Sequence, residues 1–170
     1  HVSFTAYTGE ILGIAGISGS GQKELLEAIA GLQAVESGSI EYVVDANAQP
    51  EQTEQLIGMD PIKIAQMGVV LSFVPEDRLG MGLLGSMDIP DNMMLRSYRT
   101  GHAFFTDHKV PQKLAEKVVH DLEVNTPGLT TPVRSLSGGN VQKVLVGREI
   151  SSAPTVLLTA YAVRGLDINS

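Results

Sequence analysis

Short apolar runs alternate along the chain with stretches of helical apolar spacing, and this alternation predicts an α/β protein. Residues 11–15, 69–74 and 155–160 are short and mostly apolar, which is typical of strands buried in a parallel sheet. Residues 2–7 alternate loosely and predict an edge strand, and residues 39–44 predict another strand. Because helices are predicted between these strands, we expect the sheet to be parallel.

Helices are predicted where apolar residues recur every three to four positions. In chain order they cover residues 24–30, 61–67, 88–95, 110–123 and 139–152. Residues 46–60 are polar and predict a surface excursion. Residues 85–150 are almost entirely helical, so we expect them to form a helical subdomain inserted into a core made of residues 1–84 and 151–170.

The composition is that of one globular domain. The chain has 170 residues and is 43% hydrophobic, which is enough to bury a sizeable core. A net charge of −7 and the lack of a basic run argue against binding to nucleic acid. The chain has no cysteine for a disulfide or a thiolate metal site, and no apolar run approaches the roughly 18 residues that span a bilayer.

A glycine-rich loop between the first apolar run and the first helix predicts a phosphate cradle. Residues 16–21 have the Gly-x-x-x-x-Gly spacing of a P-loop, in which backbone N–H groups and a helix N-terminus surround phosphate. A working P-loop continues with a lysine for the phosphates and a serine or threonine for magnesium, but Gln22 and Lys23 hold those positions. Lys23 cannot take the place of the lysine, because one residue along a helix turns a side chain by roughly 100°. The cradle is therefore predicted without its catalytic groups.

The Gly-x-Gly-x-x-Gly order of a dinucleotide-binding loop, the other interpretation of such a turn, is absent. The predicted nucleotide contacts are Gly16, Ser18, Gly19, Ser20, Gly21, Gln22, Lys23 and Glu24.

A second turn that suits an anion opens the last predicted helix. Residues 136–143 read Leu-Ser-Gly-Gly-Asn-Val-Gln-Lys, which combines free backbone N–H groups, a hydroxyl and a helix N-terminus. An ordinary serine-capped helix is the alternative, but the phosphate loop upstream favours a functional turn. The candidate residues are Leu136, Ser137, Gly138, Gly139, Asn140 and Gln142.

With these motifs, the chain resembles the nucleotide-binding domain of ABC transporters over essentially its full length. Residues 136–143 resemble the family signature, Gly165-Leu166-Asp167 resembles the D-loop, and residues 74–78 (Val-Pro-Glu-Asp-Arg) resemble the Q-loop region of sugar and nucleoside importers. The loop ending in Gln22-Lys23-Glu24 resembles the second cassette of importers with two cassettes in one chain, in the basic-membrane-lipoprotein (nucleoside) group or the ribose, galactose and xylose group. This implies a P-loop NTPase (RecA-like) core with a small antiparallel β portion, an inserted helical subdomain, and further sheet beyond the present C-terminus.

Several residues depart from the family pattern. The family's Walker B motif ends in Asp-Glu, which hold magnesium and polarise water, and counting back from the D-loop places these positions at Ala160 and Tyr161. Glu76, followed by Asp77, falls where many cassettes have the Q-loop glutamine. The resemblance therefore implies that this chain forms no metal site and does not hydrolyse ATP at its own site.

The family architecture implies a role for such a cassette. Two cassettes dock head to tail, so this signature turn would complete the ATP site of a catalytically complete partner, which would supply most of the Mg²⁺ contacts. The chain's own loop would hold ATP weakly. Transmembrane permease subunits and an extracytoplasmic substrate-binding lipoprotein would be the other partners, at the cytoplasmic face of the membrane. The alternatives are a docking cassette that binds no nucleotide and a soluble P-loop kinase, which would need the missing lysine and magnesium ligands.

The sequence leaves the roles of two groups of side chains open. Methionines 81, 87, 93 and 94 suit either the core or a contact with the permease. Asp77 and Arg78 are candidates for a local ion pair.

Overall fold

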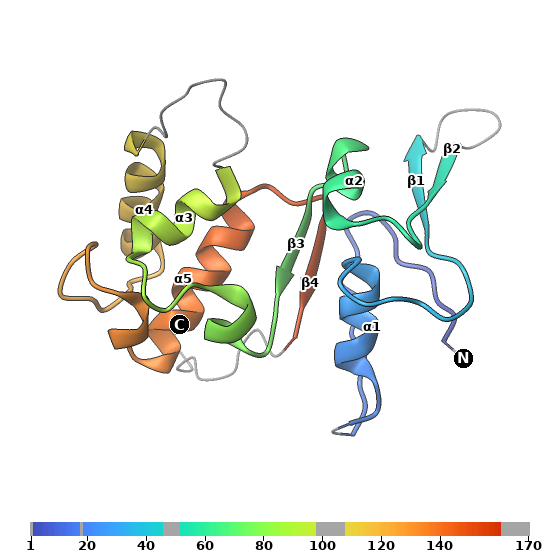
Figure 1. Cartoon of the computed structure of the whole chain (residues 1–170), viewed down its shortest axis with the longest axis horizontal. Helices are drawn as coiled ribbons and strands as arrows, with labels where there is room; N and C mark the ends of the chain where they lie inside the picture. Colours follow the sequence, from blue (N-terminus) through green and yellow to red (C-terminus); the bar gives the residue numbers. More distant parts are fainter. Residues whose placement is uncertain (1, 18, 46–51, 98–107, 161–170) are drawn as a thin grey trace.

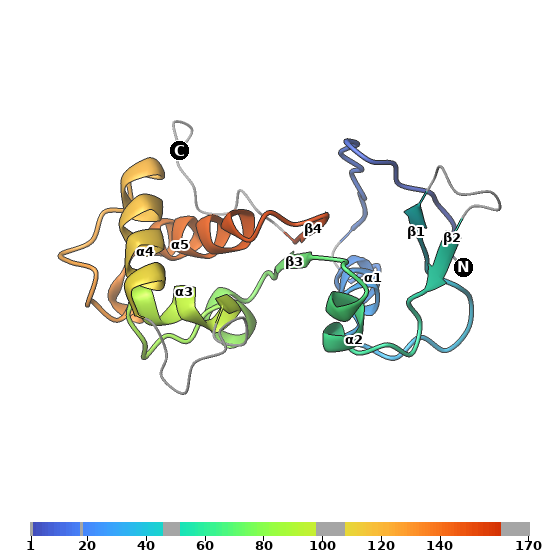
Figure 2. The ribbon, with the colours of Figure 1, turned by 90° about the horizontal axis from the view of Figure 1, so that it is seen from above.

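A computed structural model describes residues 2–17, 19–45, 52–97 and 108–160. The helices are α1 (Gln22–Ile29), α2 (Pro61–Gln66), α3 (Ile89–Ser97), α4 (Lys109–Asp121) and α5 (Gly138–Ser151), with a π-helical turn η1 (Arg78–Gly82) and a 3₁₀ turn η2 (Val133–Ser135). The strands are β1 (Glu41–Asp45), β2 (Gln52–Gln55), β3 (Leu71–Val74) and β4 (Val156–Thr159). Two views place β3 and β4 between a helical part, α3 to α5, and a part that holds α1, α2 and the β1–β2 pair (Figure 1, Figure 2).

The central strands β3 and β4 are parallel, with Leu71 opposite Val156 and Val74 opposite Thr159. This confirms the predicted α/β class and parallel pairing. β4 confirms the strand predicted at residues 155–160, but the predicted burial of this strand is wrong, since Leu157 is 42% exposed and Thr159 is also exposed. β4 pairs with β3 on one side, and no described strand pairs with its other edge.

The apolar run before the glycine loop is not a strand. No strand is assigned in residues 2–17, so the strands predicted at residues 2–7 and 11–15 are both wrong. Ile11 is 98% exposed, and Ile14 is 44% exposed. Apolar composition predicts burial, but a strand forms only where a neighbour satisfies its backbone groups, and none of the described strands lies beside this segment in a ladder.

The small antiparallel β portion is formed by β1 and β2, with Glu41 opposite Gln55. β1 lies where residues 39–44 predict a strand. β2 falls inside the segment predicted as a surface excursion. All four of its residues are exposed and polar, so no apolar alternation marks it. The backbone ladder and a bond from the Ile40 amide to Gln55 Oε1 (2.8 Å) hold the pair together.

All five predicted helices are confirmed, with ends within two residues of the predictions. Gly21 (φ 95°) and Gly31 (φ 72°) flank α1 in left-handed conformations that favour glycine. The Asp60 carboxylate accepts hydrogen bonds from the amides of Ile62 and Lys63, both at 2.9 Å, and so caps α2. Among the described residues, no helix is long and apolar enough to cross a lipid bilayer.

The larger hydrophobic core lies in the helical part. Its buried members are Val74, Leu83, Ile89, Met93, Ala115, Val118, Val124, Val133, Val141, Val144 and Leu145. α4 and α5 approach closely at Gly147, where a Cβ atom would lie 2.5 Å from Val118 Cγ1. A side chain there would force the two helices apart. Met93 belongs to this core, whereas Met81 is 47% exposed.

A charged cluster joins the sheet to the helical part. The buried Glu149 carboxylate pairs with Arg96 of α3 and, at 2.8 Å, with Arg148 Nη2. The Ser72 hydroxyl of β3 donates to the Glu149 carbonyl oxygen at 3.0 Å and accepts from Arg96 Nη2 at 2.9 Å. Burial lowers the pKa of Arg148 from its usual value, and the Glu149 carboxylate opposes this effect. β3, α3 and α5 therefore form one block around a shared carboxylate.

Candidate functional site

The glycine loop has the backbone form of a tight turn. Gly19 (φ 81°) and Gly21 (φ 95°) are left-handed, and the Ser20 amide donates to the Ile17 carbonyl oxygen at 3.1 Å. The Ser20 hydroxyl is within hydrogen-bond distance of that carbonyl (2.8 Å) and of Gln22 Oε1 (2.9 Å). Ser18 lies outside the described residues.

The side chains of the loop cover its own backbone. A Cβ atom on Gly16 would lie 2.3 Å from Gln22 Nε2 and 2.4 Å from Ser20 Oγ. The polar groups of Gln22 and Ser20 therefore lie against the backbone that a phosphate would approach. A nucleotide would have to displace them to reach the backbone at Gly16.

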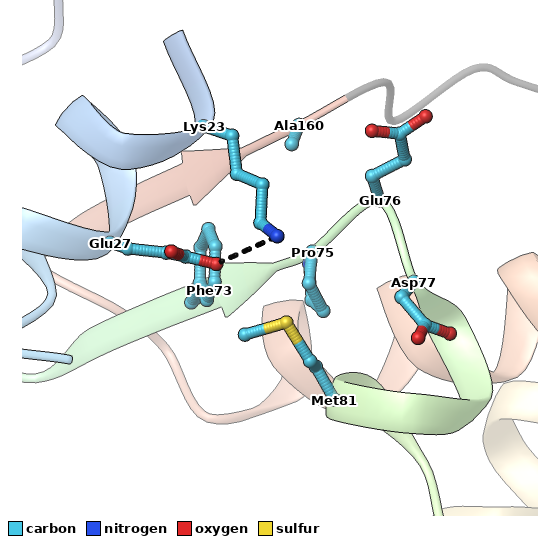
Figure 3. Close-up of a pocket in the computed structure, with 8 residues that line it drawn as sticks. All are labelled: Lys23, Glu27, Phe73, Pro75, Glu76, Asp77, Met81 and Ala160. Carbon is cyan, nitrogen blue, oxygen red and sulfur yellow. Dashed lines mark ion pairs between the residues drawn. The ribbon is translucent and has the colours of Figure 1, made fainter. Parts of the chain in front are cut away.

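The start of α1 faces a small cavity of about 250 Å³. Its lining residues are Lys23, Glu27, Phe73, Pro75, Glu76, Asp77, Met81 and Ala160 (Figure 3). The structure thus brings together four predicted site residues from three separate parts of the chain: Lys23, Glu76, Asp77 and Ala160. We call this space the loop cavity.

The charges of the loop cavity do not favour an anion. Lys23 Nζ pairs with Glu27 Oε1 at 3.7 Å, while the carboxylates of Glu76 and Asp77 point away from Lys23 (Figure 3). The Asp77 carboxylate accepts the Gly80 amide at 2.8 Å and so caps η1. The lining therefore has one ammonium group and three carboxylates, which makes weak binding of a polyphosphate the physical expectation.

The residues of the loop cavity do not fit magnesium. Mg²⁺ takes hard oxygen ligands, such as a hydroxyl and carboxylates, and the side chains of Lys23 and Ala160, which line the cavity, offer no such oxygen. Within the described ranges, no three or more His, Cys, Asp or Glu residues are grouped so that they could hold a metal ion. Tyr161 and the predicted D-loop, Gly165, Leu166 and Asp167, lie outside the described residues.

The Ser-Gly-Gly turn opens α5 as predicted. The Ser137 hydroxyl accepts the Asn140 amide at 3.4 Å and Asn140 Nδ2 at 2.9 Å, and Asn140 Oδ1 accepts the Asn125 amide at 2.9 Å. The serine cap and the candidate turn are therefore one structure. Gly138 is exposed, whereas Gln142 is only 1% exposed and belongs to the packed side of α5.

A second, more open cavity of about 410 Å³ lies in front of this turn. It is lined by Leu136, Gly138 and Val141 and, across from them, by residues 76–79. We call this space the signature cavity. Glu76 and Asp77 line both cavities, so the two candidate sites share one wall.

Arg78 has a role that the sequence does not reveal. Its Nη1 donates to the Gly138 carbonyl oxygen at 2.8 Å, across 60 positions of the chain. Asp77 caps η1 and Arg78 bonds to Gly138 of α5, so each of these residues has a contact beyond the local pair considered above. No local pattern signals a contact at such a separation.

Comparisons with known proteins agree with this arrangement. The profile of the family described as ABC transporter matches residues 1–159. The guanosine import ATP-binding protein NupO of Bacillus subtilis is 37% identical over 172 residues, and the glucose import ATP-binding protein TsgD13 of Haloferax volcanii is 36% identical over 175 residues. These matches cover 99% and 100% of this chain but only 32% and 30% of the two relatives. The chain thus spans about a third of their length.

A comparison with solved structures also finds an ABC transporter cassette. The bacterial ABC transporter cassette MJ0796, solved as a dimer, superimposes with a TM-score of 0.76 at 20% identity, covering 98% of this chain and 66% of that one. At this identity the likeness concerns the fold alone. Together with the family match over most of the sequence, it shows that the chain belongs to the ABC transporter family and has the fold of its ATP-binding cassette.

Proposed function

We propose that this chain is an energy-coupling cassette of an importer for nucleosides or simple sugars, and that its own ATP site is degenerate. The observation that supports the proposal is the loop cavity, which both Lys23 and Ala160 line, and the family pattern predicts a magnesium ligand at each of these two positions. Without these ligands, and with Gln22 in the place of the phosphate-binding lysine, the site lacks the charge stabilisation that phosphoryl transfer needs.

The intact part of this cassette is its signature turn. Residues 136–140 present a capped helix start beside an open cavity, which fits donation of the turn to the ATP site of a catalytically complete partner cassette. We propose residues 85–150 as the helical subdomain that carries the turn, and residues 165–167 as the D-loop at the same contact.

The proposed class of transported molecule follows from the relatives, whose names describe import of guanosine and of glucose. We propose permease subunits and a substrate-binding lipoprotein as further partners, and the cytoplasmic face of the membrane as the location. The parent chain would hold both cassettes, since this chain spans 32% of NupO.

A second candidate, a docking cassette that binds no nucleotide, is favoured by two observations. Gln22 and Ser20 cover the Gly16 backbone, and the loop cavity is acidic. Calorimetric titration of the chain with ATP, with and without magnesium, separates the two. Weak binding that ignores magnesium supports a nucleotide-holding site, whereas no heat of binding supports the docking cassette. Binding that requires magnesium, or measurable ATP turnover by the chain alone, would contradict the degenerate site.

The donated turn is tested in the complete transporter. Gly138→Asp places a carboxylate at the mouth of the signature cavity, where a Cβ atom would lie 3.2 Å from Arg78 Nη1. The carboxylate would repel the partner's γ-phosphate, so we expect ATPase activity to fall at least tenfold. Gly128→Asp is the matched control, because a Cβ atom there meets nothing within 4 Å. Equal activity in the two variants would contradict the donation of this turn.

A further inference from the structure

The turn η1 is attached to α5 at both of its ends. At its first residue, Arg78 Nη1 donates to the carbonyl oxygen of Gly138, where α5 begins (2.8 Å). At its last residue, the carbonyl oxygen of Gly82 accepts Arg148 Nη2 from the far end of α5 (2.7 Å). A π-helical turn is rare and frequently marks a functional site. Here it connects β3 to the signature helix through two arginines.

The two attachments differ in kind. The Arg148 side chain is only 7% exposed and belongs to the buried cluster around Glu149, so its loss would disturb the fold. Arg78 is half-buried and lies at the rim of the signature cavity. Its contact is thus the one that can be removed while the block of β3, α3 and α5 stays intact.

The stability of α5 does not account for the position of Arg78. A cation beside a helix N-terminus is opposed by the helix dipole. The Gly138 carbonyl already has a partner in regular α-helical geometry, the amide four residues on. The bond instead links the Ser-Gly-Gly turn to the residue that follows Glu76 and Asp77, the shared wall of the two cavities.

We propose that Arg78 is a positioning residue for the signature turn, an inference that rests on the proposed donation of this turn to a partner cassette. The Arg78–Gly138 bond holds the first turn of α5 in register with the segment that lines the chain's own loop cavity. Arg78 thereby sets the affinity of the partner's ATP site without being needed for the fold of the chain.

Amide hydrogen exchange tests the local part of this inference on the full chain. Arg78→Met keeps the aliphatic stem and removes the donor, whereas Arg78→Lys keeps a cationic donor. We expect Arg78→Met to speed exchange severalfold at residues 140–142 but not at residues 144–148, with Arg78→Lys in between. Uniform acceleration along α5 would show a merely structural role, and unchanged exchange at residues 140–142 would show that the bond positions nothing. Either result overturns the proposal.

Steady-state ATPase assays of the complete transporter test the consequence. We expect Arg78→Met to raise the KM for ATP about fivefold, the effect of losing one partly exposed charged hydrogen bond, with kcat changed less than twofold. Arg134→Met is the matched control, since Arg134 is an exposed arginine three residues before Ser137. An unchanged KM, or an equal rise in the control, contradicts the role of Arg78.

Gly138→Asp also disturbs Arg78, because a Cβ atom at Gly138 would lie 3.2 Å from Arg78 Nη1. The two proposals are therefore separated by comparing Gly138→Asp with Arg78→Met in the same transporter. If Gly138→Asp inactivates the transporter and Arg78→Met does not change the KM, the inference about Arg78 fails and the proposed function stands. If neither variant has an effect, the signature turn serves no partner site, and the proposed function and this inference fail together.

Discussion

The starts of two helices, α1 and α5, are the places in this cassette that would meet nucleotide. The two helices differ in how much of their surface is buried in the rest of the chain. α1 and α5 both begin next to glycines, and each faces a cavity lined by Glu76 and Asp77. α1 has no buried residue in its eight positions, whereas α5 has seven buried residues in fourteen. The helix that would serve the partner's site is held by the core, and the helix of the chain's own site is loosely held.

The difference extends to the polar groups in front of each helix. At the loop end, Gln22 and Ser20 lie over Gly16, and Lys23 is paired with Glu27. At the signature end, the cap of Ser137 leaves Gly138 exposed beside an open cavity. Side chains of the chain's own loop thus lie against the backbone at Gly16, while Gly138 of the signature turn stays exposed beside its cavity.

The largest effect is expected from breaking the anchorage of α5. Glu149→Ala leaves the guanidinium of Arg148 buried without its carboxylate partner, which costs about 3–5 kcal/mol in buried ion pairs. Urea unfolding of the chain measures the loss. Glu116→Ala, on the exposed face of α4, is the control and should change the unfolding free energy by less than about 0.5 kcal/mol. Similar losses in both variants would contradict the anchoring role.

An intermediate effect is expected from rebuilding the loop end. Gln22→Lys, Lys23→Thr and Ala160→Asp together restore the lysine, the hydroxyl and the carboxylate of a working P-loop site. We expect ATP to bind at least tenfold more tightly in the presence of magnesium than in its absence, as measured by calorimetry. If the triple variant binds no better with magnesium, the three side chains are not what the site lacks.

The smallest effect is expected from removing the ion pair at the start of α1. Lys23→Ala removes an ion pair whose lysine side chain is 58% exposed, and such pairs contribute at most about 0.5 kcal/mol between neighbouring helical turns. The unfolding free energy should therefore stay within that range in urea titrations. A loss above about 1 kcal/mol would mean that α1 is coupled to the core more tightly than its burial indicates.

Local patterns were enough to predict the helices of this fold. Asp60 and Pro61 mark the start of α2 by capping and by the fixed φ of proline. β2 could not be predicted, because its four polar, exposed residues pair only through the backbone. Residues 11–15 were predicted as a strand because apolar composition reports the tendency to be buried and not the presence of a neighbouring strand.

The sequence predicts those residues of the site that belong to recognisable motifs. The glycine spacing points to Lys23 and the family resemblance points to Ala160 as residues of one site, and the structure puts both in the loop cavity. Spacing could not show that Gln22 covers Gly16, since a side-chain rotamer decides it. Nor could it show the bond from Arg78 to Gly138, because contacts between distant segments depend on how the whole chain packs.

The buried carboxylate of Glu149 has a consequence for how the cassette responds to ionic strength. Salt screens exposed charges far more than buried ones, and the Glu149 side chain is 2% exposed against 58% for Lys23. Raising the salt concentration should therefore weaken the pair at the start of α1 and leave the junction of β3, α3 and α5 unchanged.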